Sequence, residues 1–282
     1  MFKIVDINSY EILDSRGIPT LMTEVVLDNN IRGIAAVPSG ASTGVHEAIE
    51  LRDGDINRYK GKGVLKNISL INSIILDAIQ GLDVREQNKI DKVLLELDGT
   101  SNKKKLGANT ILSVSLSAAK AAANSEHVQL YSYLGGVASQ KLPIPLVNII
   151  NGGAHASNNL DIQEYMLAPL GADSFHQAIR WSSEIFYNLK EILKKKGLST
   201  SVGDEGGFAA NFTNNTDPIE YLIKAIKASK LNPEKDVLIS LDVAATEFYK
   251  ANKYILASEK KKLSGEDMVD YLVSLRNKYP IF

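Results

Sequence analysis

The sequence predicts an α+β domain followed by a β/α barrel. In the first half, alternating apolar and polar residues give way to apolar residues at helical spacing, which is typical of a β-meander followed by helices. In the second half, short apolar runs with polar residues at their ends alternate with amphipathic helices, as in β/α barrels. Gly135-Gly136 and the prolines Pro143 and Pro145 separate the two patterns. We therefore expect a first domain over residues 1–136 and a second over residues 143–282.

The first domain is expected to begin with strands. An extended segment near residues 2–7 is followed by alternation over residues 20–27, and the extended pattern resumes at residues 31–37. Asp28-Asn29-Asn30 supplies turn residues between the last two, so they form a hairpin. Apolar spacing then predicts three helices, over residues 70–78, 90–97 and 108–123. The alanines of the last helix indicate close packing rather than chemistry.

The second domain is expected to alternate strands and helices. The strands are predicted at residues 145–150, 161–167 and 237–243. Ser174 supplies a start signal for a helix over residues 175–193, Asp217-Pro218 for a second helix, and Ser264 for a third. Residues 259–263 are interpreted as a lysine-rich loop.

Composition excludes several classes of function. Lys and Arg number 32 against 33 Asp and Glu, a net charge of -1, so no global basic field attracts nucleic acid. The absence of cysteine excludes disulfides and thiolate sites, so any metal must bind to oxygen or imidazole. No apolar run approaches the roughly 20 residues of a membrane span, and the first residues lack the pattern of a secretory signal. We expect a soluble cytoplasmic protein.

Carboxylates near strand ends are the first candidates for chemistry. Asp242 ends an apolar strand, where it either pairs with a lysine or a helix N-terminus, or binds Mg²⁺, which prefers hard oxygen ligands. Asp204 and Glu205 lie between glycines, in what is either a solvated acidic turn or a loop that brings carboxylates to a ligand. Gln163 and Glu164 are expected at the end of another strand. Clustered carboxylates raise one another's pKa, which suits a general acid.

Two further segments are weaker candidates. His155 follows the first strand of the second domain in Asn151-Gly152-Gly153-Ala154-His155, although a lone histidine is more often structural. The loop Pro38–Gly44 is rich in small and hydroxyl residues and could close over a phosphate or a metal. It lacks the Gly-Lys-Ser/Thr ending of a nucleotide P-loop, and alone it is most often just a loop.

Taken together, these segments resemble the enolase family over nearly the whole chain. Each motif is weak by itself, but their order matches the family. The matching segments are Asp14–Gly17, Pro38–Glu47, Asp98–Thr100, Lys105–Asn109, Asn151–His155, Gln163-Glu164, Gly203–Gly207 and Leu241-Asp242. The resemblance implies a small α+β capping domain followed by a barrel whose first strands depart from simple β/α alternation. It also implies dehydration of 2-phospho-D-glycerate to phosphoenolpyruvate in glycolysis, a small phosphorylated substrate, Mg²⁺, and commonly a homodimer.

The resemblance also implies a role for each matched residue. Glu205 is the acid that protonates the departing hydroxyl, and Glu164 supports it. Gln163 and His155 contact substrate. Asp242 holds the catalytic Mg²⁺, and Ser39, on a mobile loop, joins a second Mg²⁺ once substrate is bound.

The resemblance stops short of a full catalytic set. In the family, the chain continues past a segment like Tyr279–Phe282 into strands that supply two more carboxylate ligands, the lysine base and basic phosphate-binding residues. We therefore expect a C-terminally truncated enolase with an incomplete barrel, inactive as given and prone to instability or aggregation at an open parallel edge.

Two other interpretations remain open. One is a catalytically dead fragment or pseudoenzyme that acts as a binding or assembly element. The other is another barrel enzyme of the superfamily, such as a sugar-acid dehydratase, although these usually place a ligand and the base differently and lack the long loop with Ser39.

Overall fold

The computed structural model describes residues 2–40 and 43–282. The chain divides into two compact units, Met1–Lys141 and Leu142–Phe282, each described by itself below. Ala41 and Ser42, which belong to the predicted Pro38–Gly44 loop, lie outside the described residues. Among the described residues, no helix has the length and apolar character needed to cross a bilayer.

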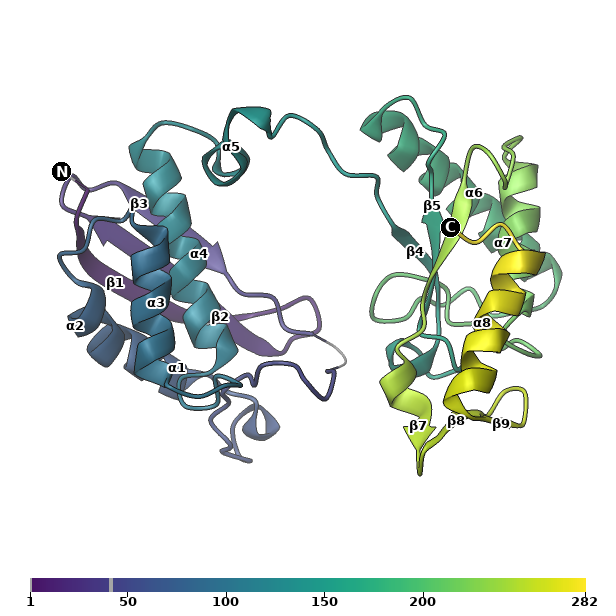
Figure 1. The fold of residues 1–282 in the computed structure, drawn as a ribbon, viewed down its shortest axis with the longest axis horizontal. Helices are drawn as coiled ribbons and strands as arrows, with labels where there is room; N and C mark the ends of the chain where they lie inside the picture. The colour runs from purple at the N-terminus through teal and green to yellow at the C-terminus, as the bar shows by residue number, and fades with distance from the viewer. Residues whose placement is uncertain (1, 41–42) are drawn as a thin grey trace. The chain divides into compact units, whose positions relative to one another are not determined.

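The first unit contains a three-stranded antiparallel sheet in the order β1-β2-β3 (Figure 1). The strands are β1 (Ile4–Leu13), β2 (Pro19–Leu27) and β3 (Arg32–Ala36). The predicted hairpin is confirmed, since Leu27 N–H donates to Ile31 O at 2.9 Å and Asn30 takes a φ of 63° in the turn. Strand β1 is longer than predicted because its second half pairs with β2 as far as Leu13↔Pro19.

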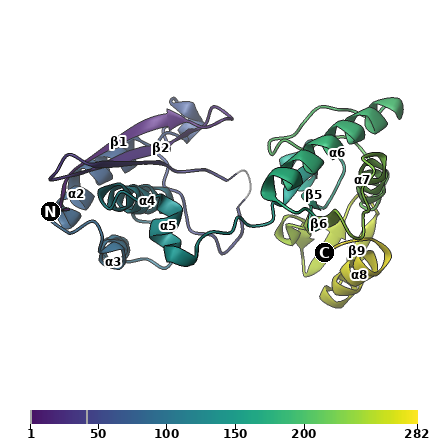
Figure 2. The ribbon, with the colours of Figure 1, turned by 90° about the horizontal axis from the view of Figure 1, so that it is seen from above.

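Helices cover one face of this sheet (Figure 2). They are α1 (Leu65–Leu70), a π-helical turn (Ile71–Ile75), α2 (Leu76–Ile79), α3 (Gln87–Asp98), α4 (Ala108–Ser125) and α5 (Leu130–Gly135). Ala118, Ala121 and Ala122 of α4 are fully buried, so the close packing predicted for the alanine-rich helix is confirmed. Small side chains let α4 approach the strands, which stabilises the unit through dense apolar contact.

The second unit contains another three-stranded sheet, in the order β4-β5-β6. Its strands are β4 (Val147–Asn151), β5 (Glu164–Ala168) and β6 (Leu238–Asp242). The central strand runs antiparallel to both neighbours. The prediction that Gln163 and Glu164 end a strand is wrong, because β5 begins at Glu164. Ile162 is buried but precedes the strand, and its burial explains why the apolar pattern extends too far toward the N-terminus.

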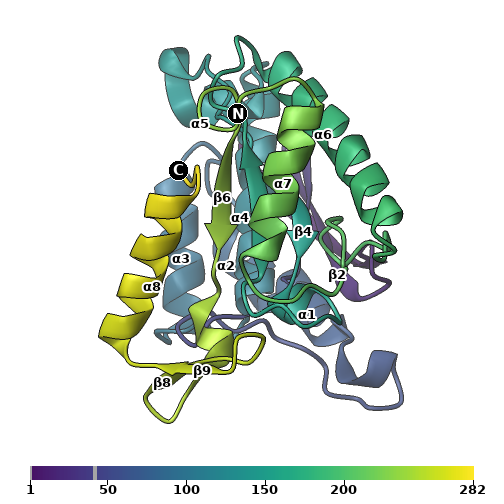
Figure 3. The same cartoon turned by 90° about the vertical axis from the view of Figure 1, so that its right-hand side faces the viewer.

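Three long helices pack along this sheet (Figure 3). They are α6 (Phe175–Lys195), α7 (Asp217–Ala228) and α8 (Gly265–Lys278). Both serine start signals are confirmed: Ser174 accepts from Gln177 N–H, and Ser264 forms a capping box with Asp267. These helices and strands share one apolar core that includes Tyr165 and Phe208.

The lysine-rich segment was predicted to be a loop, and this prediction is wrong. The segment forms part of a small antiparallel sheet. Its strands are β7 (Tyr249–Lys250), β8 (Lys253–Leu256) and β9 (Lys261–Leu263). Only one side chain of the three strands, Leu256, is buried, so the sequence carries almost no apolar alternation to reveal them.

The strands of the second unit do not close into a barrel within the described residues. At the outer edge of β6, Ile239 N–H donates to Pro280 O at 2.9 Å, and the Ile239 carbonyl accepts from Phe282 N–H at 3.0 Å. This pairing is a single parallel bridge between Ile239 and Ile281, so the edge expected to stay open is partly covered by residues 280–282. The architecture is an α+β domain followed by an incomplete barrel.

Candidate active site

Three polar residues from three strands lie in one row across the second sheet. Asn151 of β4 pairs with Glu164 of β5, and Glu164 pairs with Asp242 of β6. Residues directly opposite each other in antiparallel strands have Cβ atoms about 4.5–5.5 Å apart and point to the same face. Because β5 is antiparallel to both neighbours, its first residue meets their last residues. The two carboxylates are therefore neighbours at one end of the sheet.

Glu164 is the half-buried centre of this row. Its Oε1 lies 3.0 Å from Nδ1 of His155, whose side chain is only 8% exposed. Burial raises the pKa of Glu164, His155 lowers it, and the negative charges of Asp242 and Glu205 raise it again, with a net shift upward. A carboxyl group in this environment holds a proton more readily than an exposed one.

Gln163 connects the start of β5 to Asp242. Its backbone N–H donates to Asp242 O at 3.1 Å, and its side-chain Nε2 donates to Asp242 Oδ2 at 3.2 Å. The other oxygen of that carboxylate accepts from Ala244 N–H at 3.1 Å. The Gln163 Oε1 atom is buried without a hydrogen-bond partner among the described residues.

The loop Gly203–Gly207 is anchored on β4. Gly203 N–H donates to Gly207 O at 2.8 Å, and Gly206 takes a φ of +82°, a conformation that favours glycine. The next residue, Phe208, bridges to β4: its N–H donates to Ile149 O at 2.8 Å, and its carbonyl accepts from Asn151 N–H at 3.0 Å. This backbone pairing fixes where the two acids of the loop lie.

Asn151 is a positioning residue that sequence reasoning left without a role. It is fully buried, and its Nδ2 donates to His155 O at 3.4 Å. A Cβ added at Gly207 would lie 2.3 Å from Asn151 Oδ1, so the side chain packs directly against the acidic loop. The signal that identified Asp242, a polar residue ending an apolar strand, is also present at Asn151.

The loop acids face two different hollows. Asp204 and His155 line a hollow of about 400 Å³. Glu205 is exposed and lines a second hollow of about 310 Å³ beside Asn148 and Phe186. Both Asn148 side-chain polar atoms are buried without partners among the described residues. Glu205 nevertheless lies near enough to Glu164 to raise its pKa.

Ser39 lies in the first unit, where its hydroxyl is already engaged. It donates to Glu50 Oε2 at 3.1 Å and accepts from an Arg52 Nη at 3.0 Å. Arg16 donates to its carbonyl at 2.7 Å. A metal that binds the Ser39 hydroxyl oxygen uses one of its two lone pairs and so competes with Arg52, whereas the hydrogen bond donated to Glu50 can remain.

The donor set of the second unit fits a magnesium ion of the kind completed by substrate and water. In the described part of the chain, no three His, Asp, Glu or Cys side chains converge on one metal position. Mg²⁺, however, is usually held by one or two carboxylates together with substrate oxygens and waters. Asp242 supplies one such carboxylate, and Glu164 lies beside it in the sheet.

The raised pKa of Glu164 predicts how the stability of the folded state depends on pH. A carboxyl group whose pKa is higher in the folded state stabilises that state at low pH and loses this contribution as pH rises through its folded pKa. We therefore expect Glu164→Gln to raise the midpoint of thermal unfolding near pH 7, with a smaller gain near pH 4. Differential scanning calorimetry at the two pH values measures the gain. Glu191→Gln, on the exposed face of α6, is the control; an equal pH dependence there would contradict the assignment.

Comparison with known protein families matches both units. Residues 4–134 match the model described as "Enolase, N-terminal domain". Residues 139–282 match the model described as "Enolase, C-terminal TIM barrel domain". The two matches together span nearly the whole chain, in the order in which the two units occur. The chain belongs to the enolase family.

Proposed function

We propose that the gene product catalyses the magnesium-dependent dehydration of 2-phospho-D-glycerate to phosphoenolpyruvate, as in glycolysis. The observation that supports this most is the row in which Glu164 and Asp242 are neighbours, with His155, Gln163 and Glu205 around them. Dehydration needs an acid for the departing hydroxyl and stabilisation for negative charge beside a carboxylate. This end of the sheet carries groups suited to both.

Each residue has a proposed role in this reaction. Glu205, exposed on its loop, donates a proton to the leaving hydroxyl so that it departs as water. Glu164, whose pKa is raised, supports Glu205 in this role as the acid. The Oε1 of Gln163 and the imidazole of His155 orient the substrate. Asp242 would hold Mg²⁺, which when bound supplies Lewis-acid stabilisation of developing negative charge.

Residues 1–282 alone are proposed not to complete the reaction. Proton abstraction next to a carboxylate needs a base, which the family resemblance assigns to a lysine. The proposal assigns Glu205 and Glu164 to the acid half of the chemistry and no residue of this chain to the base half.

A paired activity assay tests the proposal. The 282-residue chain and the product of the complete reading frame are supplied with 2-phosphoglycerate, and phosphoenolpyruvate is measured with and without Mg²⁺. We expect turnover only from the complete product and only with the metal. We also expect Asp242→Asn in that product to raise the Mg²⁺ concentration for half-maximal activity by about tenfold or more, since one charged ligand is lost. Activity that persists without a divalent ion would remove the metal assignment.

A further inference from the structure

The outer edge of β3 in the first unit presents unpaired backbone groups. The bonds Leu27 N–H to Ile31 O and Val37 N–H to Leu21 O set the alternation of the β2–β3 ladder. By that alternation, the N–H and C=O groups of Arg32, Ile34 and Ala36 point away from β2. The Arg32 carbonyl accepts from Asn124 Nδ2 at 2.7 Å. Within the described residues, the corresponding groups of Ile34 have no partner.

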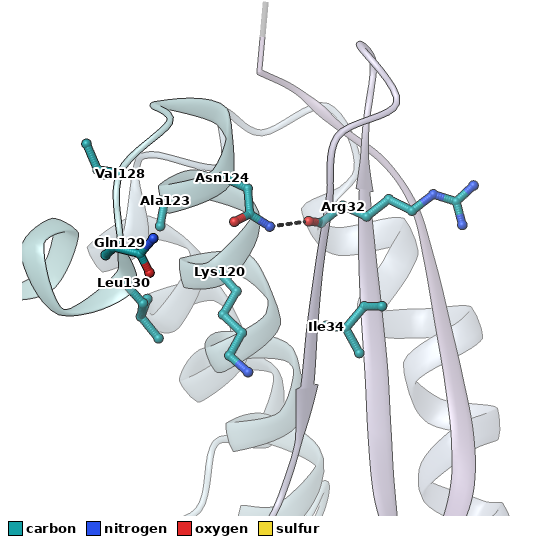
Figure 4. Close-up of a pocket in the computed structure, with 8 residues that line it drawn as sticks. All are labelled: Arg32, Ile34, Lys120, Ala123, Asn124, Val128, Gln129 and Leu130. Atoms are coloured by element: carbon teal, nitrogen blue, oxygen red, sulfur yellow. Dashed lines mark hydrogen bonds between the residues drawn. The ribbon is translucent and has the colours of Figure 1, made fainter.

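A hollow of about 380 Å³ lies beside this edge (Figure 4). It is formed by β3, the C-terminal half of α4 and the segment that leads into α5. Its lining residues are Arg32, Ile34, Lys120, Ala123, Asn124, Val128, Gln129 and Leu130. The residues Ile34 and Val128 are 47% and 40% exposed, so apolar surface is open next to the unpaired backbone.

The charge of the hollow comes from Lys120. No acidic residue is among the described residues that line it, and Lys120 forms no ion pair within the described part of the chain. Arg32 contributes little, because its guanidinium pairs with Glu24 at 3.1 Å and points away from Lys120 (Figure 4). Lys120, a half-buried residue, therefore has no ion-pair partner among the described residues between α4 and the strand edge.

We propose that this edge and hollow bind an extended acidic peptide segment of a partner protein. The segment adds to β3 as a fourth strand through Ile34 N–H and C=O and places an apolar side chain beside Ile34, on the face away from α4. The next residue of the segment points to the opposite face and places a carboxylate at Lys120. A small carboxylate could satisfy Lys120 alone. The unpaired backbone and the adjoining apolar surface favour a peptide, because only an extended chain uses all three features.

Binding of a defined probe to the full 282-residue chain tests this proposal. The probe is a fluorescein-labelled hexapeptide of alternating Val and Glu, and its Val-Lys counterpart is the charge control. We expect a saturable rise in anisotropy with the acidic peptide. Lys120→Glu is expected to weaken binding about tenfold, since an attraction becomes a repulsion. Lys104→Glu, the same charge change on an exposed residue outside the hollow, should change it less than about twofold.

A second variant separates strand addition from charge attraction. Ile34→Pro removes the N–H that points outward and leaves the hydrogen bonds to β2 in place. An edge strand tolerates proline at such a position. We expect weaker binding with an unchanged far-ultraviolet circular dichroism spectrum. Unchanged binding in either Lys120→Glu or Ile34→Pro would overturn the proposal. Equal competition by free glutamate would assign the hollow to small carboxylates. If no peptide bound and Lys120→Glu lost self-association, the hollow would be assigned to a second copy of the chain. Either result would also overturn the peptide proposal.

Discussion

Glu205→Gln in the complete gene product is expected to lower kcat for phosphoenolpyruvate formation by about 10²- to 10⁴-fold, the usual contribution of a positioned general acid. Glutamine keeps the size and hydrogen-bonding capacity of the side chain but has no proton to donate to the leaving hydroxyl. Because Glu205 is exposed and lines a hollow, the substitution should not perturb the core. Steady-state kinetics with saturating Mg²⁺ measures kcat and KM separately.

The control for this variant is Glu191→Gln, the same chemical change at an exposed position of α6. It should retain kcat within about twofold, as surface substitutions away from a site usually do. If Glu205→Gln also retained full turnover, the proton donor would have to be another group, and Glu164, with its raised pKa, would be the first to examine.

Features set by neighbouring residues could be predicted from the sequence. Ser174 and Ser264 predict helix starts because a serine cap acts within one turn, and both helices begin where expected. The hairpin at Asp28-Asn29-Asn30 depends on the same kind of local signal. The alanine run in α4 likewise predicts close packing, since small side chains bury little and permit near approach.

Strand direction could not be predicted in this way. Pairing joins residues far apart in the chain, such as Glu164 and Asp242, and the apolar pattern of a short strand does not reveal the direction of its neighbours. Glu164 was expected beside Asp242 as the end of a strand. It lies beside Asp242 as the beginning of one, because β5 is antiparallel to β6.

Ionisation at the site also depends on the fold. Nothing in the order of residues distinguishes the surroundings of Glu164 from those of other carboxylates. Its raised pKa arises from burial and from Asp242 and Glu205, which strand pairing and the glycine loop bring near. The hydrogen bonds of the Ser39 hydroxyl with Glu50 and Arg52 likewise depend on the fold, and no sequence motif predicts them.

Gly207→Ala is expected to displace the acidic loop from β4. The added Cβ would lie 2.3 Å from Asn151 Oδ1 and 2.9 Å from backbone atoms of Ile149 and Ile150, and backbone in a sheet cannot move aside without breaking its hydrogen bonds. Overpacking of this kind costs about 1–3 kcal/mol. Hydrogen–deuterium exchange at the Phe208 and Asn151 amides, which bridge loop and strand, should quicken by about tenfold or more.

Gly265→Ala is the matched control within the same unit. No atom lies within 4 Å of a Cβ added there, and its φ is not positive, so alanine should be neutral or slightly stabilising in the first turn of α8. If the Phe208 amide exchanged at the same rate in Gly207→Ala and Gly265→Ala, the position of the loop would not depend on close approach at Gly207. Since Asp204 and Glu205 are carried by that loop, a displaced loop should also remove part of the upward pKa shift of Glu164. The pH dependence of stability measured with Glu164→Gln would then be smaller in a Gly207→Ala background.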